Sequence, residues 1–165
     1  MKILVPVKRT IGSNVKARVK YDQTGVGLAN GKMSMNPFCE IGVEEAIRLK
    51  EKEGGDVTVL GFGPDRVQQA LRESLARGAT KALHVKRDSA DADSLGIAMV
   101  LAAAIKSLPH DLVFFGKQGV GTDNSLVGPM VAELLGYPQV NVVTHLEVAD
   151  GKVTAATCIE RVAPT

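Results

Sequence analysis

Residues 112–136 read LVFFGKQGVGTDNSLVGPMVAELLG, and this stretch decides the predicted fold. A short apolar run leads into a glycine-rich segment at 116–125, and an amphipathic helical pattern follows. A buried strand, a glycine-rich turn and a helix start can hold a phosphate, because glycine allows close approach and the first helical N–H groups are free to donate. We therefore predict a nucleotide phosphate at this turn. Three small polar residues are candidate caps for the helix: Asp123, Asn124 and Ser125.

The composition is that of one globular domain, which we place over residues 1–165, with 45% hydrophobic and 23% charged residues. Aromatic residues make up 4%, Trp is absent, and the net charge is +2. Few stacking side chains and scattered basic residues argue against nucleic-acid binding. The longest apolar stretch, residues 97–105, is too short to span a membrane, so we expect no membrane insertion.

Neither a metal site nor a targeting segment is indicated. Cys39 and Cys158 lack a Cys-x-x-Cys spacing, and the three histidines show no ligand pattern. The chain enters an apolar run at residues 3–7 with no signal or transit segment before it. We therefore expect a reducing, cytoplasmic location.

Apolar runs and amphipathic patterns alternate along the chain. Apolar runs predict strands at 3–7, 56–60, 82–85 and 112–115. Helical patterns predict helices at 36–52, 67–78, 92–108 and 124–135. This repeated βαβ order predicts an α/β fold with a doubly wound, mostly parallel sheet.

Three details of this pattern carry their own predictions. Asn36-Pro37 marks a helix start, with Asn36 as the cap. Residues 61–64 read Gly-Phe-Gly-Pro and predict a turn after the second strand. The helix at 92–108 is apolar nearly all round, so we expect it to be well buried.

Two hairpins are predicted outside the repeated unit. Residues 15–35 alternate apolar and basic side chains around a turn at 22–25, which favours a β-hairpin arm with a solvated basic face. Residues 140–159 alternate around Asp150-Gly151 and predict a terminal hairpin.

Ligands of such sheets bind at the carboxyl ends of strands, near the point where strand order reverses. The glycine turn at 116–125 lies after the fourth predicted strand, and the 34–40 loop enters a helix beside it. Lys8 and Arg9 follow the first strand and are either anion contacts or solvated. The alternative interpretation of the glycines at 116–125 is an ordinary tight turn between strand and helix that binds no phosphate.

Known nucleotide motifs fit the turn poorly. Gly119-Val120-Gly121 lacks the third glycine of a Rossmann fingerprint, and no P-loop is present. The Gly-x2-Gly-x9-Gly-Ser/Thr pattern of nucleotide-binding stress proteins is met only in its first half. Asp123 is better explained as a cap than as a base. Cys39 has no His nearby in sequence, which disfavours a nucleophile.

Several segments together resemble the β subunit of electron transfer flavoproteins. The likeness runs over almost the whole chain, and the match at 32–52 is long and specific. The segments that carry it are 5–9 (VPVKR), 32–40 (KMSMNPFCE), 43–52 (VEEAIRLKEK), 78–79 (GA) and 116–118 (GKQ).

The resemblance implies a fold like that of adenine-nucleotide α-hydrolase-like domains and a heterodimer with an α subunit. It implies a structural AMP in this chain and an FAD shared with the α subunit. Electrons would pass from acyl-CoA or other flavin dehydrogenases to a quinone oxidoreductase of the respiratory chain, so the chain would be a carrier component and not a self-contained enzyme. The implied cofactor-binding residues are Pro6, Asn36, Pro37, Phe38, Cys39, Phe62, Gly116, Lys117, Gln118, Gly119, Val120, Gly121, Thr122, Asp123, Asn124, Ser125 and Val127.

The chain departs from the family pattern in places. Residues 121–127 differ from the usual acidic loop, and 127–129 look more like electron-bifurcating members, in which a second FAD replaces AMP. The 32–40 segment looks like the AMP-binding members, which we favour. Ser13 stands where many members have Tyr near the flavin, and members continue beyond residue 165.

Two alternatives from other classes stay open. One is a stand-alone adenine-nucleotide-binding protein of the stress type. The other is an ATP-pyrophosphatase-like enzyme, which needs a Ser-Gly-Gly-x-Asp-Ser loop that residues 11–14 do not supply.

Overall fold

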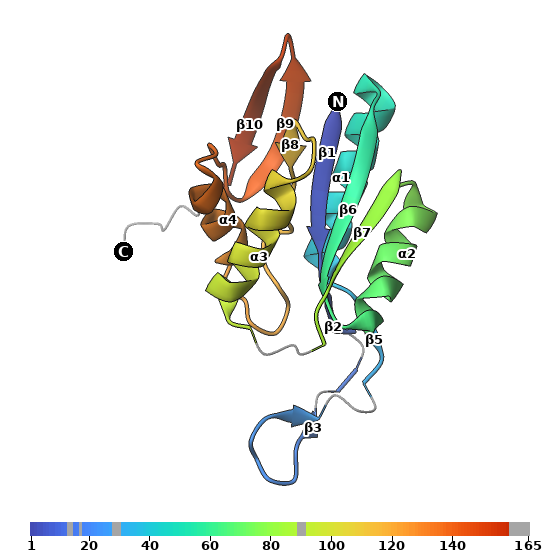
Figure 1. Cartoon of the computed structure of the whole chain (residues 1–165), viewed down its shortest axis with the longest axis vertical. Coiled ribbons are helices and arrows are strands. Elements are labelled where there is room, and N and C mark those ends of the chain that lie inside the picture. The colour runs from blue at the N-terminus through green and yellow to red at the C-terminus, as the bar shows by residue number, and fades with distance from the viewer. Residues whose placement is uncertain (13–14, 17, 28–30, 89–91, 159–165) are drawn as a thin grey trace, which may run out of the picture.

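The centre of the molecule is a parallel sheet (Figure 1). The computed structural model describes residues 1–12, 15–16, 18–27, 31–88 and 92–158. The sheet has four strands in the order β7-β6-β1-β8. They are β1 (Lys2–Val7), β6 (Asp56–Gly63), β7 (Lys81–Lys86) and β8 (Leu112–Val113), and each neighbouring pair is parallel.

Helices cover both faces of the sheet, which confirms the predicted doubly wound α/β fold (Figure 1). They are α1 (Pro37–Glu53), α2 (Gln68–Arg77) after the short 3-10 helix η1 (Asp65–Val67), α3 (Ser94–Lys106) and α4 (Val127–Leu135). Side chains alternate between the faces along β1. Ile3 and Val5 pack under α1 and α2, whereas Leu4 packs with Leu60 under α3 and α4.

The predicted turn at 61–64 is wrong, because β6 continues through Gly63 and pairs with β7 along this length. The glycines serve packing here. A Cβ at Gly61 would lie 2.5 Å from the Val67 side chain and 3.2 Å from Leu71, so glycine lets η1 and α2 lie directly against the strand.

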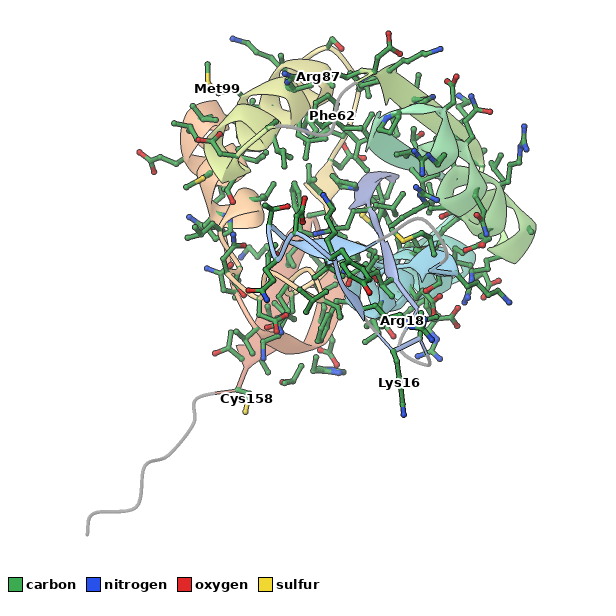
Figure 2. The ribbon with its side chains drawn as sticks, turned by 90° about the horizontal axis from the view of Figure 1, so that it is seen from below. Lys16, Arg18, Phe62, Arg87, Met99 and Cys158 are labelled. Carbon is green, nitrogen blue, oxygen red and sulfur yellow. The ribbon has the colours of Figure 1, made fainter. Side chains whose placement is uncertain are left out.

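Helix α3 is less buried than its apolar composition predicts. Leu95 and Met99 are 49% and 57% exposed, and Figure 2 shows Met99 on the outer side of the molecule. Four α3 residues are buried against the sheet and α4, namely Ala98, Leu101, Ala102 and Ile105. The expectation of a well-buried helix is therefore wrong for its outer face.

Antiparallel pairs form the excursions from this body. In the predicted arm, β3 (Arg18–Val19) pairs with β4 (Val26–Gly27), and at its base β2 (Arg9–Ile11) pairs with β5 (Met33–Met35). The arm strands are shorter than predicted, and parts of the 15–35 prediction, like Ser13, lie outside the described residues. The terminal hairpin is confirmed as β9 (Val143–Ala149) and β10 (Lys152–Thr157).

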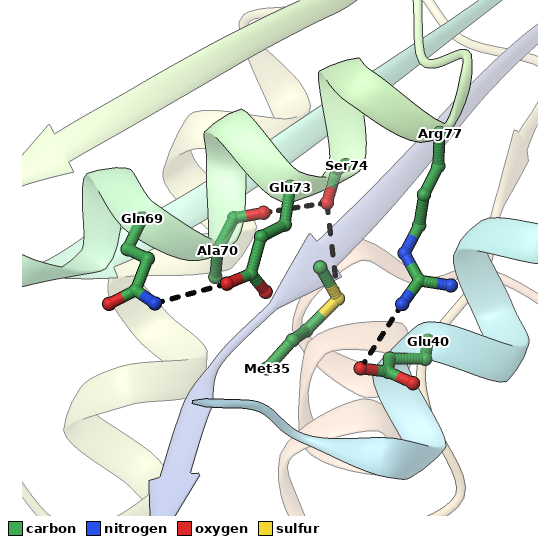
Figure 3. Close-up of polar contacts among 7 residues, drawn as sticks. All are labelled: Met35, Glu40, Gln69, Ala70, Glu73, Ser74 and Arg77. Atoms are coloured by element: carbon green, nitrogen blue, oxygen red, sulfur yellow. Dashed lines mark hydrogen bonds and ion pairs between the residues drawn. The ribbon is translucent and has the colours of Figure 1, made fainter. Parts of the chain in front are cut away.

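Helix α2 anchors β5 and the start of α1, which carry the candidate site (Figure 3). The Ser74 hydroxyl donates to the Ala70 carbonyl at 2.9 Å and lies 3.9 Å from Met35 Sδ. Arg77 pairs with Glu40 in the first turn of α1, with 3.4 Å between nitrogen and oxygen. These contacts fix the direction in which residues 36–40 leave β5.

Candidate functional site

The strand order reverses between β1 and β8. The chain passes from β1 outward to β6 and β7 and then crosses to β8 on the other side of β1. Open α/β sheets bind ligands at such a point, outside the carboxyl ends of the strands. Figure 2 views the molecule from this end. Lys8 directly follows β1 there and the segment 116–126 follows β8, so the predicted turn lies at the switch point.

Asn36 joins the two predicted site segments across more than 80 residues of sequence. Its side chain is 1% exposed, donates through Nδ2 to the Gln118 carbonyl at 2.8 Å, and accepts through Oδ1 from the Val120 N–H at 3.1 Å. Its own N–H donates to the Lys8 carbonyl at 2.9 Å. Asn36 stands at the N-cap position of α1 but its side chain makes no capping hydrogen bond, so the predicted capping role is wrong.

Gly116 lets the turn touch the first turn of α1. A Cβ at this position would lie 2.6 Å from the Phe38 carbonyl carbon and 2.7 Å from the Cys39 nitrogen. Both are backbone atoms, which cannot rotate aside as a side chain does. The structure thus brings Asn36, Phe38 and Cys39 together with residues 116–120.

The distal part of the turn is held by its own hydrogen bonds. The Gly119 carbonyl accepts from the N–H groups of Thr122 and Asp123 at 3.2 and 2.9 Å. Gln118 Nε2 donates to Asp123 Oδ1 at 3.0 Å. Gly121 has φ of 101° and Asp123 has φ of 45°, so the backbone is left-handed where the turn reverses.

The predicted caps of the following helix are wrong. Helix α4 begins at Val127, its N-cap residue is Leu126, and no side chain caps it. The Asp123 carboxylate accepts a hydrogen bond from the Gln118 amide, and Asn124 Nδ2 donates to the Ser94 hydroxyl of α3 at 3.0 Å. Ser94 is a contact that the sequence reasoning missed, since only the folded topology brings α3 to this turn.

Several backbone donors of the turn have no acceptor within the described part of the chain. They include the N–H groups of Gly119, Gly121, Asn124 and Ser125, and those of Val127 and Gly128 in the first turn of α4 are in the same state. Unsatisfied N–H groups beside a helix start attract anions. Among the described residues no cluster of three or more His, Cys, Asp and Glu side chains is placed to hold a metal ion.

The Cys39 thiol is an unreactive part of this packing. It is 5% exposed and accepts from Asn36 Nδ2 at 3.2 Å. Burial raises the pKa of Cys39, although the Asn36 amide and the backbone N–H groups of Lys8 and Gly116 oppose the change. A neutral buried thiol is a poor nucleophile, which agrees with the reading from sequence.

The other predicted residues are more dispersed. Phe62 and Val127 are half-buried and pack with Phe115 against the α3 and α4 core, whereas Pro6 is buried in β1 opposite Leu60. Pro37 and Lys117 are exposed, as are the turn residues Val120–Leu126. The clustered part of the predicted site is therefore residues 36, 38, 39 and 116–120.

No helix within the described ranges is long and apolar enough to cross a membrane.

Comparison with known proteins identifies the family of the chain. The model of the electron transfer flavoprotein domain matches residues 24–162. The electron transfer flavoprotein subunit beta of Bradyrhizobium diazoefficiens is 45% identical over 159 residues, covering 93% of this chain and 63% of that protein.

Eukaryotic relatives give the same result. The human electron transfer flavoprotein subunit beta is 46% identical over 84% of this chain and 56% of its own length. The Arabidopsis thaliana relative, whose name adds "mitochondrial", is 45% identical over 84% of this chain and 55% of its own length. The chain thus spans 55–63% of the length of these relatives. A family match over most of the chain, together with this level of identity, shows that the chain belongs to the electron transfer flavoprotein β-subunit family.

Proposed function

We propose that this chain is the nucleotide-binding core of an electron transfer flavoprotein β subunit and that it holds AMP at the 116–126 turn. The observation that carries the proposal is a glycine turn at the switch point of the sheet, which Asn36 clamps with two hydrogen bonds. Several backbone N–H groups of this turn have no protein acceptor within the described residues. A phosphate supplies the acceptors that these donors lack.

The turn fits a phosphate in its donor chemistry. Backbone N–H groups can donate to a phosphate, and Gly121 leaves open space where a side chain would stand. The only acidic side chain in the turn, Asp123, is held by the Gln118 amide. The role of the chain is then to bind and orient the nucleotide, with no covalent step.

The flavin carries the redox chemistry of the complex. FAD, when bound in the site shared with an α subunit, supplies the electron-transfer chemistry, and the protein supplies position and electrostatics. Half-buried Phe38 lies at the start of α1 beside the turn, where the family resemblance puts a contact with the flavin. We assign no catalytic residue to this chain.

The α subunit, the acyl-CoA or other flavin dehydrogenases and the quinone oxidoreductase remain proposals that rest on the family. The cytoplasmic location is likewise a proposal, since one relative is named mitochondrial. Co-expression with the matching α subunit tests the assembly. We expect co-purification with one flavin per heterodimer, and separate elution without flavin would contradict it.

The bound nucleotide is tested by denaturing the purified chain and identifying the released small molecules by mass spectrometry. About one AMP per chain supports the proposal, whereas FAD supports the electron-bifurcating alternative that residues 127–129 suggest. The absence of any adenine nucleotide, together with no AMP binding by calorimetry, would overturn it. Micromolar ATP binding by the isolated chain would favour the stress-type alternative.

A pair of variants links the released nucleotide to the described geometry. Asn36→Ala removes both hydrogen bonds that clamp the turn, whereas Asn141→Ala removes an exposed asparagine far from it in sequence. We expect nucleotide content to fall in the first variant and to stay at the wild-type level in the second. Equal contents in both variants would contradict a site at this turn.

A further inference from the structure

Lys8 lies against the glycine turn at the point where strand order reverses. A Cβ at Gly119 would lie 3.2 Å from Lys8 Cδ and Cε and would overlap the ammonium nitrogen itself. The absence of a side chain at residue 119 therefore creates the space that the Lys8 ammonium occupies. This contact joins the end of β1 to the turn that follows β8.

The backbone of Lys8 is fixed, while its charge has no partner within the described chain. Its carbonyl accepts from the Asn36 N–H at 2.9 Å, and its N–H faces the buried Cys39 thiol. No carboxylate of the described residues lies within ion-pair distance of the Lys8 ammonium. Asp123, the acidic residue of the turn, is bonded to Gln118 instead.

The neighbouring cations are placed differently. Arg9, the next residue, is half-buried at the start of β2, where burial and then Arg66 lower its pKa while Glu73 opposes the change. Lys117 is exposed, and it makes no hydrogen bond or ion pair within the described residues. Lys8 is thus the cation whose position is set by contact with the turn.

We propose that Lys8 is a specificity-determining residue of the nucleotide site, whose ammonium pairs with the phosphate and selects nucleotides over nucleosides. This inference rests on the proposed function, because it assigns a charge to the same site. Backbone N–H groups orient the phosphate, but their partial charges leave most of a dianion unneutralised. A lysine at the rim supplies a full charge without the fixed geometry of an arginine.

The test compares AMP with adenosine by calorimetry on the intact chain, using Lys8→Gln, Lys8→Arg and Lys152→Gln. We expect Lys8→Gln to weaken AMP binding by up to about fivefold, the upper end of the range of an exposed ion pair, and to leave adenosine binding unchanged. Lys8→Arg keeps the charge and retains most of the affinity. Lys152→Gln, the loss of one exposed lysine in the terminal hairpin and outside the turn, leaves both ligands unaffected.

The outcomes separate this inference from the proposed function. Wild-type protein that binds no adenine nucleotide would overturn both. Wild-type protein that binds AMP while Lys8→Gln binds it equally well, or loses AMP and adenosine to the same extent, would overturn the role of Lys8 alone. Circular dichroism melts establish that each variant is folded, and Lys8→Arg provides a folded comparison if Lys8→Gln is not.

A double-mutant cycle tests whether Gly119 acts through Lys8. Gly119→Ala displaces only the mobile end of the lysine side chain, so we expect a folded protein with weaker AMP binding and reduced salt dependence. In the Lys8→Gln background the same alanine should cause no further loss, since the charge that it displaces is gone. Additive losses would contradict the coupling.

Discussion

Gly116→Ala is the sharpest test of the site geometry. The new Cβ would lie 2.6 Å from the Phe38 carbonyl carbon and 2.7 Å from the Phe38 oxygen and the Cys39 nitrogen. These atoms belong to the first turn of α1, so the turn after β8 must move away from the helix. Moving it also separates Asn36 from its partners at residues 118 and 120.

The expected loss of stability follows from these contacts. Inserting a methyl group against fixed neighbours costs about 1–3 kcal/mol, and the two Asn36 hydrogen bonds contribute about 1 kcal/mol each. The free energy of unfolding should therefore fall by about 3–5 kcal/mol. With a urea slope of about 2 kcal/mol/M, the unfolding midpoint falls by about 1.5–2.5 M.

Gly42→Ala is the matched control, because it adds the same methyl group on the α1 side of the contact between α1 and Gly116. Its Cβ would lie 3.7 Å from the Gly116 nitrogen, which is ordinary contact, and the position is inside helix α1. Alanine should therefore stabilise the protein by up to about 1 kcal/mol. Urea unfolding followed by circular dichroism measures both variants. A midpoint for Gly116→Ala within error of wild type would refute the close approach of turn and helix.

Four further predictions concern the thiols, the core and Asn36. Burial raises the pKa of Cys39, so a thiol reagent at neutral pH should label Cys158 alone, and equal labelling of both cysteines would be inconsistent with this. Because the unfolded thiol ionises near pH 8.5, stability should fall as pH rises above about 8, and Cys39→Ala should remove that part of the pH dependence in urea titrations. Gly61→Ala should cost about 1–3 kcal/mol through its contact with Val67, and an unchanged melting temperature would count against the packing described. Asn36→Asp buries a carboxylate whose pKa must rise, so its stability should fall as pH rises from 4 to 7, whereas a flat profile would mean that the side chain is hydrated.

The order of strands and helices could be predicted because it depends on local periodicity. Apolar runs such as residues 3–7 and 56–60 are long enough to identify buried strands, and Gly54 and Gly78 end the helices as expected. The position of the glycine turn at 116–125 beside the end of β1 could also be predicted, since a parallel sheet puts every carboxyl end of a strand at one edge. These features need no knowledge of distant contacts.

The errors arose where tertiary contacts overrode local signals. Asn36 has the sequence of a helix cap, yet its side chain bonds to residues 118 and 120, which local sequence cannot reveal. Gly61 looked like a turn residue but permits close packing of η1 on β6. The exposure of the outer face of α3 could not be predicted, because a helix that is apolar on all sides gives no signal of which side packs against the rest of the protein.

The Asn36 clamp also has a consequence for the order in which the protein folds. Its partners lie 82 and 84 residues away, so the contact forms only after the chain from β5 to β8 has closed into the sheet. Long loops add entropic cost to such closures, which delays them relative to local helices and hairpins. We therefore expect the proposed nucleotide site to assemble late and to open early, with amide hydrogen exchange in residues 116–121 faster than in β1 and β6. If nucleotide binds at the turn, its binding would then require that the start of α1 and the segment after β8 have already come into contact.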